Sequence, residues 1–108
     1  MQDLIDEIMD FQVKTFPTST PISKLHHLAK EIPELIEELE KHYNNFGDIE
    51  ATEMEFADCF LLLFGAAAMY GLNEDSIKNA IYRKLVINRA RKWGKPDEKT
   101  GVVLHIKE

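Results

Sequence analysis

Two carboxylates, Glu55 and Asp58, border the most apolar stretch of the chain, and their spacing suits metal chemistry. Asp58 is the only charged residue in the seventeen-residue segment 56–72, and Glu55 lies one turn before it. A helix of that composition is expected to be buried nearly all round, and an ionised carboxylate at its edge is costly unless it is paired or binds a metal. We therefore interpret these two residues as ligands of a divalent cation, with a satisfied structural carboxylate as the alternative.

A second group of acids lies on the predicted helix 21–42. Acidic residues three apart occur seven times in the chain, so this spacing alone does not discriminate. Their position relative to the apolar side of this helix does discriminate between them. Glu31, Glu34 and Glu38 follow one edge of that side, whereas Glu37 and Glu40 point away from it. The apolar side is formed by Leu25, Leu28, Ile32, Leu35 and Leu39. Side chains three or four residues apart on one helix face can chelate a metal together. The two acidic groups can meet if their helices are antiparallel neighbours.

Basic residues are concentrated near the C-terminus. Segment 76–96 holds seven of the 13 basic residues and no acid, which leaves six basic residues beside all 19 acidic ones. Segregation of this kind suits a site that places metal-binding carboxylates opposite phosphate-binding cations. A basic helix packed against acidic helices would give the same pattern.

The predicted fourth helix changes character along one side. Its expected buried side begins with Ile77, Ala80 and Ile81. Two turns further on, the same side becomes polar, and polar groups that point into a helical interior need anionic partners. Metal-bound carboxylates or phosphates would serve, and a buried salt bridge is the alternative. The polar residues are Lys84, Asn88 and Arg91.

Hydrophobic periodicity predicts an all-α fold with four helices in a single domain, 1–108. The helices are expected over residues 3–14, 21–42, 50–70 and 74–92. Thr20 and Asn73 are expected N-caps, and Gly71 ends the third helix. Pro33 should kink or divide the second helix. Residues 44–48 form a turn, and the tail 102–106 is either a short strand or an arm that lies on a neighbour.

Composition excludes several classes of function. The formal charge of −6 argues against a nucleic-acid polymer as partner. The apolar run 59–72 is too short to cross a bilayer, and the acidic N-terminus is unlike a signal peptide, so we expect a cytoplasmic protein without a membrane partner. Cys59 lies within the apolar run and is expected to be a small buried hydrophobe.

Taken together, these residues resemble the MazG-like all-α nucleoside triphosphate pyrophosphohydrolases, and the dATP/dGTP diphosphohydrolase-like branch, often found in phages, in particular. The resemblance covers about residues 15–106. It rests on the two acidic pairs, on the Lys84-x-x-x-Asn88-x-x-Arg91 helix, and on the segments TFPTST, KLHHLAKEIPEL, EMEFADCFLLLFGAA and KLVINRARKWGKPDEKTGVVLHIK.

The resemblance implies hydrolysis of a deoxynucleoside triphosphate to the monophosphate and pyrophosphate, and hence control of the nucleotide pool. It implies Mg²⁺, with Mn²⁺ as the alternative, bound by Glu31, Glu34, Glu55 and Asp58. Either Glu34 or Glu38 would accept a proton from the attacking water. The residues expected to bind the nucleotide are Lys84, Asn88 and Arg91, with Phe16 as a candidate for stacking on the base.

The chain departs from the family pattern in both acidic motifs. Many relatives carry a doubled glutamate at the head of each motif, where this chain has Lys30 and Met54. The competing hypotheses are a non-catalytic helical oligomerisation module and a nucleotide sensor. Whether the chain is an enzyme or an oligomerisation module, its apolar third helix has more apolar surface than one chain can cover. We therefore expect a homodimer or homotetramer.

Overall fold

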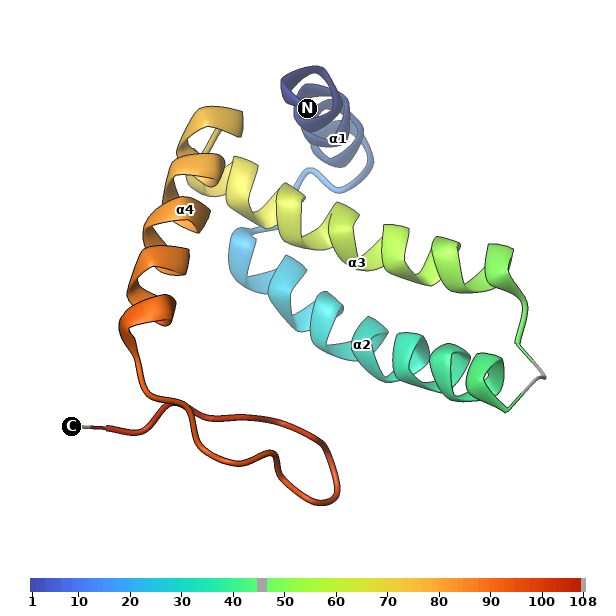
Figure 1. Ribbon diagram of the computed structural model, residues 1–108. Helices are drawn as coiled ribbons and strands as arrows, with labels where there is room; N and C mark the ends of the chain where they lie inside the picture. Colours follow the sequence, from blue (N-terminus) through green and yellow to red (C-terminus); the bar gives the residue numbers. More distant parts are fainter. Residues whose placement is uncertain (45–46, 108) are drawn as a thin grey trace. The chain divides into compact units, whose positions relative to one another are not determined.

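Four α-helices make up the computed structural model, which describes residues 1–44 and 47–107 (Figure 1). They are α1 (Gln2–Thr15), α2 (Pro21–Tyr43), α3 (Ile49–Tyr70) and α4 (Glu74–Ala90). In the described residues the only β pairing is a single isolated bridge. The predicted all-α, four-helix class is confirmed. The chain divides into two units, Met1–Asp75 and Ser76–Glu108, which are described separately.

The start of α2 is fixed by a reciprocal cap. The Thr20 hydroxyl accepts a hydrogen bond from the Ser23 backbone N–H at 3.0 Å, and the Ser23 hydroxyl accepts one from the Thr20 N–H at 2.8 Å. Pro21 occupies the first turn, where its missing N–H costs nothing. Pro33 lies inside α2 without dividing it, although proline removes one backbone N–H donor from the helix.

Helix α3 packs against both α2 and α1. It begins after Asp48, whose carboxylate accepts from the Glu50 N–H at 2.9 Å, and it ends at Gly71, which takes a left-handed conformation with φ of 114°. A side chain at Gly71 would be strained in that conformation. Residues 45 and 46 of the predicted turn 44–48 lie outside the described residues.

The expectation that α3 is buried nearly all round is wrong for a single chain. Cys59 and Ala66 are buried, and Cys59 is the small core residue that was predicted. Phe60 and Leu63, however, are 53% and 48% exposed. Within the unit Met1–Asp75, the helices that pack against α3 are α1 and α2, and two helices cannot cover every face of a third.

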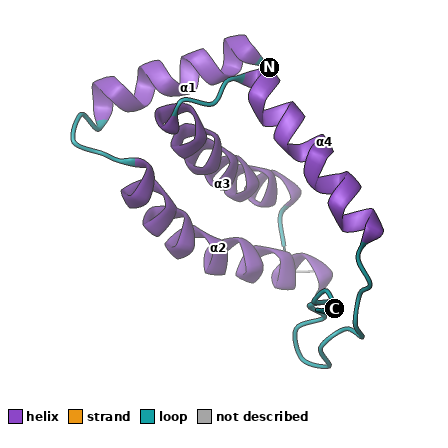
Figure 2. Cartoon of the chain, turned by 90° about the vertical axis from the view of Figure 1, so that its left-hand side faces the viewer, coloured by secondary structure: helices purple, strands orange, loops and turns teal. Residues whose placement is uncertain are grey.

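In the second unit, α4 ends at Ala90, two residues before the predicted end, and the chain then folds back on itself (teal in Figure 2). The Ile106 N–H donates to the Lys92 carbonyl at 2.7 Å, and the Gly94 N–H donates to the Leu104 carbonyl at 2.8 Å. The tail is therefore not a regular strand, and an arm that lies on a neighbour stays a prediction. It closes a loop through a bridge between Trp93 and His105.

The predicted buried side of α4 is not covered by its own unit: none of its residues is buried, and Ile81 is 54% exposed. Its burial stays a prediction, because a helix gains a buried side only where another element covers it. No individual helix in the described residues has both the length and the apolar character of a membrane span, although the bent pair α3 and α4 meets those criteria together.

Candidate active site

The packing of α2 against α3 gathers three glutamates. Glu31 and Glu34 are one turn apart on α2, and Glu55 faces them from α3. Each offers a carboxylate oxygen, and these three oxygens lie within 4.8 Å of one another. Glu31 and Glu55 are half-buried, whereas Glu34 is exposed. Three of the four predicted metal ligands are thus brought together.

The acidic neighbours of Glu34 raise its pKa above the ordinary value. The largest cause is the hydrogen bond that it shares with Glu31, followed by the negative charge of that residue. Desolvation and the charges of Glu55 and Asp58 act in the same direction. A raised pKa favours the protonated form of Glu34, which lowers the negative charge of the cluster.

Glu55 is the residue of the cluster whose carboxylate is not fully hydrogen-bonded. Its Oε2 atom is buried and has no hydrogen-bond partner among the described residues. Desolvation raises the pKa of Glu55, and the charges of Asp58, Glu31 and Glu38 raise it further. A buried carboxylate oxygen without a donor is destabilising, so this atom is suited to a cation.

Two further predicted residues lie beside this group. Asp58 is outside the three-oxygen cluster, but its charge raises the pKa of both Glu34 and Glu55. Glu38 is one turn beyond Glu34 on α2, and its carboxylate accepts a hydrogen bond from Lys41 Nζ at 3.4 Å.

The donor set fits a hard divalent cation. Carboxylate oxygens are the preferred ligands of Mg²⁺, which holds them at about 2.1 Å, so that two opposite oxygens are about 4.2 Å apart. The present spacing of up to 4.8 Å needs only small side-chain movements to reach that value. Desolvation raises the pKa of the buried Cys59 thiol, and the charges of Glu31, Glu55 and Asp58 raise it further. This cysteine therefore stays a neutral packing residue.

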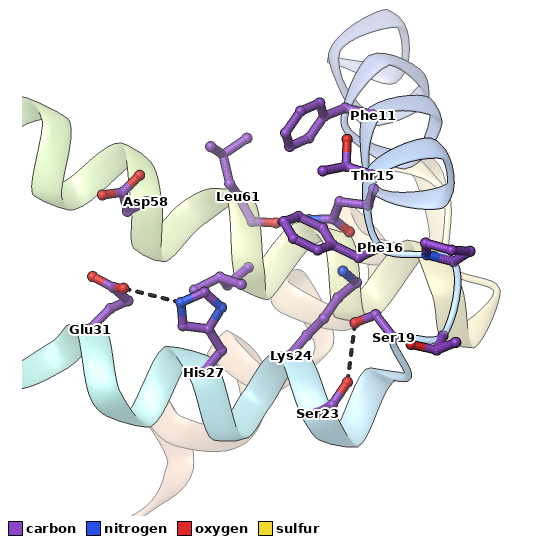
Figure 3. A pocket seen from close by; sticks show the side chains of 14 residues that line it. Phe11, Thr15, Phe16, Ser19, Ser23, Lys24, His27, Glu31, Asp58 and Leu61 are labelled. Carbon is purple, nitrogen blue, oxygen red and sulfur yellow. Dashed lines mark hydrogen bonds and ion pairs between the residues drawn. The ribbon is translucent and has the colours of Figure 1, made fainter.

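A cavity of about 620 Å³ adjoins the acidic cluster. Glu31 and Asp58 lie at one end, and the loop between α1 and α2 lies at the other (Figure 3). The volume is within the range of small-molecule sites. The lining residues are Phe11, Gln12, Thr15, Phe16, Pro17, Thr18, Ser19, Ser23, Lys24, His27, Glu31, Asp58, Leu61 and Leu62.

Phe16 lies in this wall, as a base-stacking role requires. Its ring meets that of Phe11 edge to face, with centroids 6.1 Å apart, and it is 49% exposed. His27 also lines the cavity, with a side chain that is 56% exposed. Its Nε2 donates to Glu31 Oε1 at 3.1 Å, because an ionised carboxylate can only accept.

Sequence reasoning missed two residues of the cavity, Lys24 and Gln12. Both are buried, with 3% and 5% exposure. For Lys24 the sequence held a signal: it lies one turn before His27 and two turns before Glu31, on the same side of α2. Gln12 could not be found in this way, because its environment is created by the packing of α1 on α3.

The predicted substrate-binding residues Lys84, Asn88 and Arg91 belong to the second unit. Lys84 is exposed on α4, and Asn88 is half-buried near its end. Arg91 follows the last residue of the helix, and its Nη1 donates to Asn88 Oδ1 at 3.2 Å. Their role in binding stays a prediction.

Comparison with known proteins gives a family and a structural relative. The family model described as dATP/dGTP pyrophosphohydrolase matches residues 4–108. Among solved structures, the chain is similar to a cyanophage S-2L MazG-like pyrophosphohydrolase bound to dGDP and three catalytic Mn²⁺ ions per active site. The identity is 28% and the TM-score 0.72, with 97% of this chain and 95% of the relative covered. No curated protein sequence matches the chain.

Proposed function

The chain belongs to the dATP/dGTP pyrophosphohydrolase family, and we propose that it hydrolyses deoxynucleoside triphosphates to monophosphate and pyrophosphate with Mg²⁺, in the cytoplasm, thereby limiting the nucleotide pool. The observation that carries this proposal is the buried, unpartnered Oε2 of Glu55 inside a cluster of three carboxylates.

Glu31, Glu34 and Glu55 would hold the metal, and Asp58 would complete the set from the cavity side. A divalent cation supplies charge neutralisation for the phosphates and lowers the pKa of water. Carboxylates accept Mn²⁺ as well as Mg²⁺, and the cyanophage relative holds Mn²⁺.

Glu38 is the better of the two candidates for accepting the proton of the attacking water. It lies outside the three-oxygen cluster yet close enough to raise the pKa of Glu55, whereas Glu34 is itself a member of the cluster. Water attacks the α-phosphorus, a new phosphorus–oxygen bond forms, and the bond to the oxygen that bridges the α- and β-phosphates breaks. The water's proton passes to Glu38 and pyrophosphate leaves.

Lys84 and Arg91 are proposed to offset the charge that develops on pyrophosphate, and Asn88 is proposed to bind a phosphate or sugar oxygen. Phe16 is proposed to stack on the base, since an aromatic ring in the wall of the cavity offers a face to any nucleobase. Binding of dGDP by the cyanophage relative supports a purine nucleotide as the ligand.

The test is pyrophosphate release from the four common dNTPs with Mg²⁺ or Mn²⁺. Glu55→Gln keeps the size of the side chain and removes its charge, so we expect a loss of at least a hundredfold in kcat. Glu53→Gln is the matched control, because Glu53 is exposed on the same helix. Full activity of the Glu55 variant would contradict the proposal.

We also propose that the enzyme is a homodimer, or a tetramer built from dimers. An apolar groove between α1 and α3, lined by Leu4, Phe60 and Phe64 among others, is open in the single chain. The rings of Phe56, Phe60 and Phe64 form a ladder with successive centroids 6.4 and 6.0 Å apart. A second copy of the chain would cover this surface.

A further inference from the structure

Lys24 is a buried cation without an anionic partner. The residue is 3% exposed, and the described residues show no ion pair to its ammonium. The ammonium is not among the buried polar atoms that lack a partner, so it reaches the solvent of the cavity that Lys24 lines. The nearest feature is the ring of Phe16, whose centroid lies 5.7 Å from the ammonium. Desolvation lowers the pKa of Lys24. An anion or hydrogen-bond acceptor that enters the cavity can therefore contact this ammonium directly.

Gln12 leaves an acceptor unused in the same wall. Its Nε2 donates to the Leu61 carbonyl at 3.0 Å, which fixes the orientation of the amide, and its Oε1 is buried without a partner. Gly65 makes room for this amide, because a Cβ at that position would collide with it. Among the described residues, the cavity therefore presents one buried acceptor without a partner, on Gln12, and one donor, on Lys24, that faces the cavity.

The donor on Lys24 and the acceptor on Gln12 together indicate which part of a nucleotide would bind beside them. An ionised phosphate offers only acceptors, so it could satisfy Lys24 but not Gln12. A nucleobase edge offers both kinds of group. Lys24 also lies two turns from Glu31, or about 10.5 Å along α2, towards the end of the cavity that the loop between α1 and α2 forms (Figure 3). The walls beside it, at Phe11 and Leu61, are apolar, as a base requires.

We propose that Lys24 reads the base of the substrate and favours a 6-oxopurine such as guanine over adenine. The inference rests on the proposed function for the identity of the ligand as a nucleotide. The oxygen O6 and the nitrogen N7 of guanine lie side by side, and an ammonium can donate to both. Adenine replaces that oxygen with an amino group, which is itself a donor. Gln12 Oε1 accepts from the ring N–H or amino group of the same base.

The test compares kcat/KM for dGTP and dATP in the wild type and in Lys24→Met. We expect the wild type to prefer dGTP and the variant to lose about tenfold on dGTP, while dATP changes less than threefold. The Lys24→Met protein should fold, because an apolar side chain of similar size replaces an unpaired buried charge. Lys24→Gln is a second variant, expected to shift the preference towards dATP because an amide pairs with adenine N6 and N7. Lys14→Met, at an exposed lysine of α1, is the control.

A second readout separates this inference from the proposed function. Calorimetric titration with dGMP and dAMP in EDTA requires no metal and no turnover, and we expect dGMP to bind about tenfold more weakly to Lys24→Met than to the wild type. If that loss occurs but the wild type releases no pyrophosphate from any dNTP, the proposed function fails and the base-reading role stands. An equal loss on both nucleotides would place Lys24 on the phosphate or sugar, and no loss would make it a structural lysine; either result would overturn the inference.

Discussion

Glu31 on α2 and Glu55 on α3 hold carboxylate oxygens within 4.8 Å of each other, and Glu34 adds a third oxygen to the same space. Each negative charge disfavours ionisation of its neighbours: Glu31 raises the pKa of both Glu34 and Glu55. Helices α2 and α3 pack together in spite of this repulsion, not because of it. The metal-free protein is therefore strained at the point where the proposed chemistry occurs.

Removal of one of these charges should stabilise the metal-free protein. We expect Glu34→Gln to raise Tm by a few degrees in EDTA, because the new amide can donate to Glu31 instead of repelling it. The wild type should gain stability when Mn²⁺ is added, by about 2.7 kcal/mol at one hundred times Kd, and the variant should gain much less. Thermal unfolding in EDTA and in Mn²⁺ measures both effects. Glu40→Gln, at an exposed position of α2, should change neither, and a variant that is less stable in EDTA would refute the repulsion.

The acidic cluster was predictable because it depends on local spacing and on one neighbouring helix. Residues one turn apart share a face, and the caps at Thr20 and Gly71 mark the ends of their helices in the sequence. What the sequence left open was the level at which α2 and α3 meet, since Pro33 and the turn between the helices both affect it. The structure places Glu31, Glu34 and Glu55 together.

The remainder of the site depends on contacts between distant segments. Gln12 becomes a buried, half-satisfied amide only because α1 packs on α3, and Lys24 becomes a buried cation only because the loop after α1 covers it. Burial of one side of α4 depends in the same way on an element outside its own unit. Apolar periodicity shows that a side can be covered, but it does not show whether the partner is in the same chain.

His27 should tune the affinity of the metal through Glu31. Its Nε2 donates to Glu31 Oε1 at 3.1 Å, and this bond orients the carboxylate. Residues that support a metal ligand in this way typically change metal affinity by 10- to 100-fold when they are removed. We expect His27→Ala to weaken Mn²⁺ binding about tenfold, as measured by calorimetric titration. His26→Ala, at its exposed neighbour, should bind Mn²⁺ normally, and equal affinities in both variants would show that the hydrogen bond is incidental.

The turn after α4 should respond to acid through Asp97. Hydrogen bonds from the backbone N–H groups of Thr100 and Lys99, and then from the Thr100 hydroxyl, lower the pKa of Asp97. Because the folded-state pKa lies below the unfolded one, the stabilisation is complete above the unfolded pKa and is lost as pH falls through the folded one. An NMR titration should show the Lys99 and Thr100 amides moving with a midpoint below 3.8. Thr100→Ala should raise that midpoint, and a midpoint at the ordinary value in the wild type would contradict the assignment.

The aromatic ladder on α3 should hold copies of the chain together. Phe60 is 53% exposed in the single chain and lies between Phe56 and Phe64. Glutamate at the centre of an apolar interface would leave a buried charge unpaired, which typically costs several kcal/mol and is enough to separate a micromolar dimer.

Light scattering after gel filtration measures the effect. We expect the wild type at twice or more the chain mass of 12.5 kDa and Phe60→Glu close to that mass. Tyr43→Glu is the control, because Tyr43 is 80% exposed at the end of α2, away from the ladder, and its variant should keep the wild-type mass. Since Phe60 is already half-exposed, the monomeric variant should retain its helical circular dichroism. A wild-type protein that elutes as a monomer at micromolar concentration would mean that the exposed face of α3 serves another purpose.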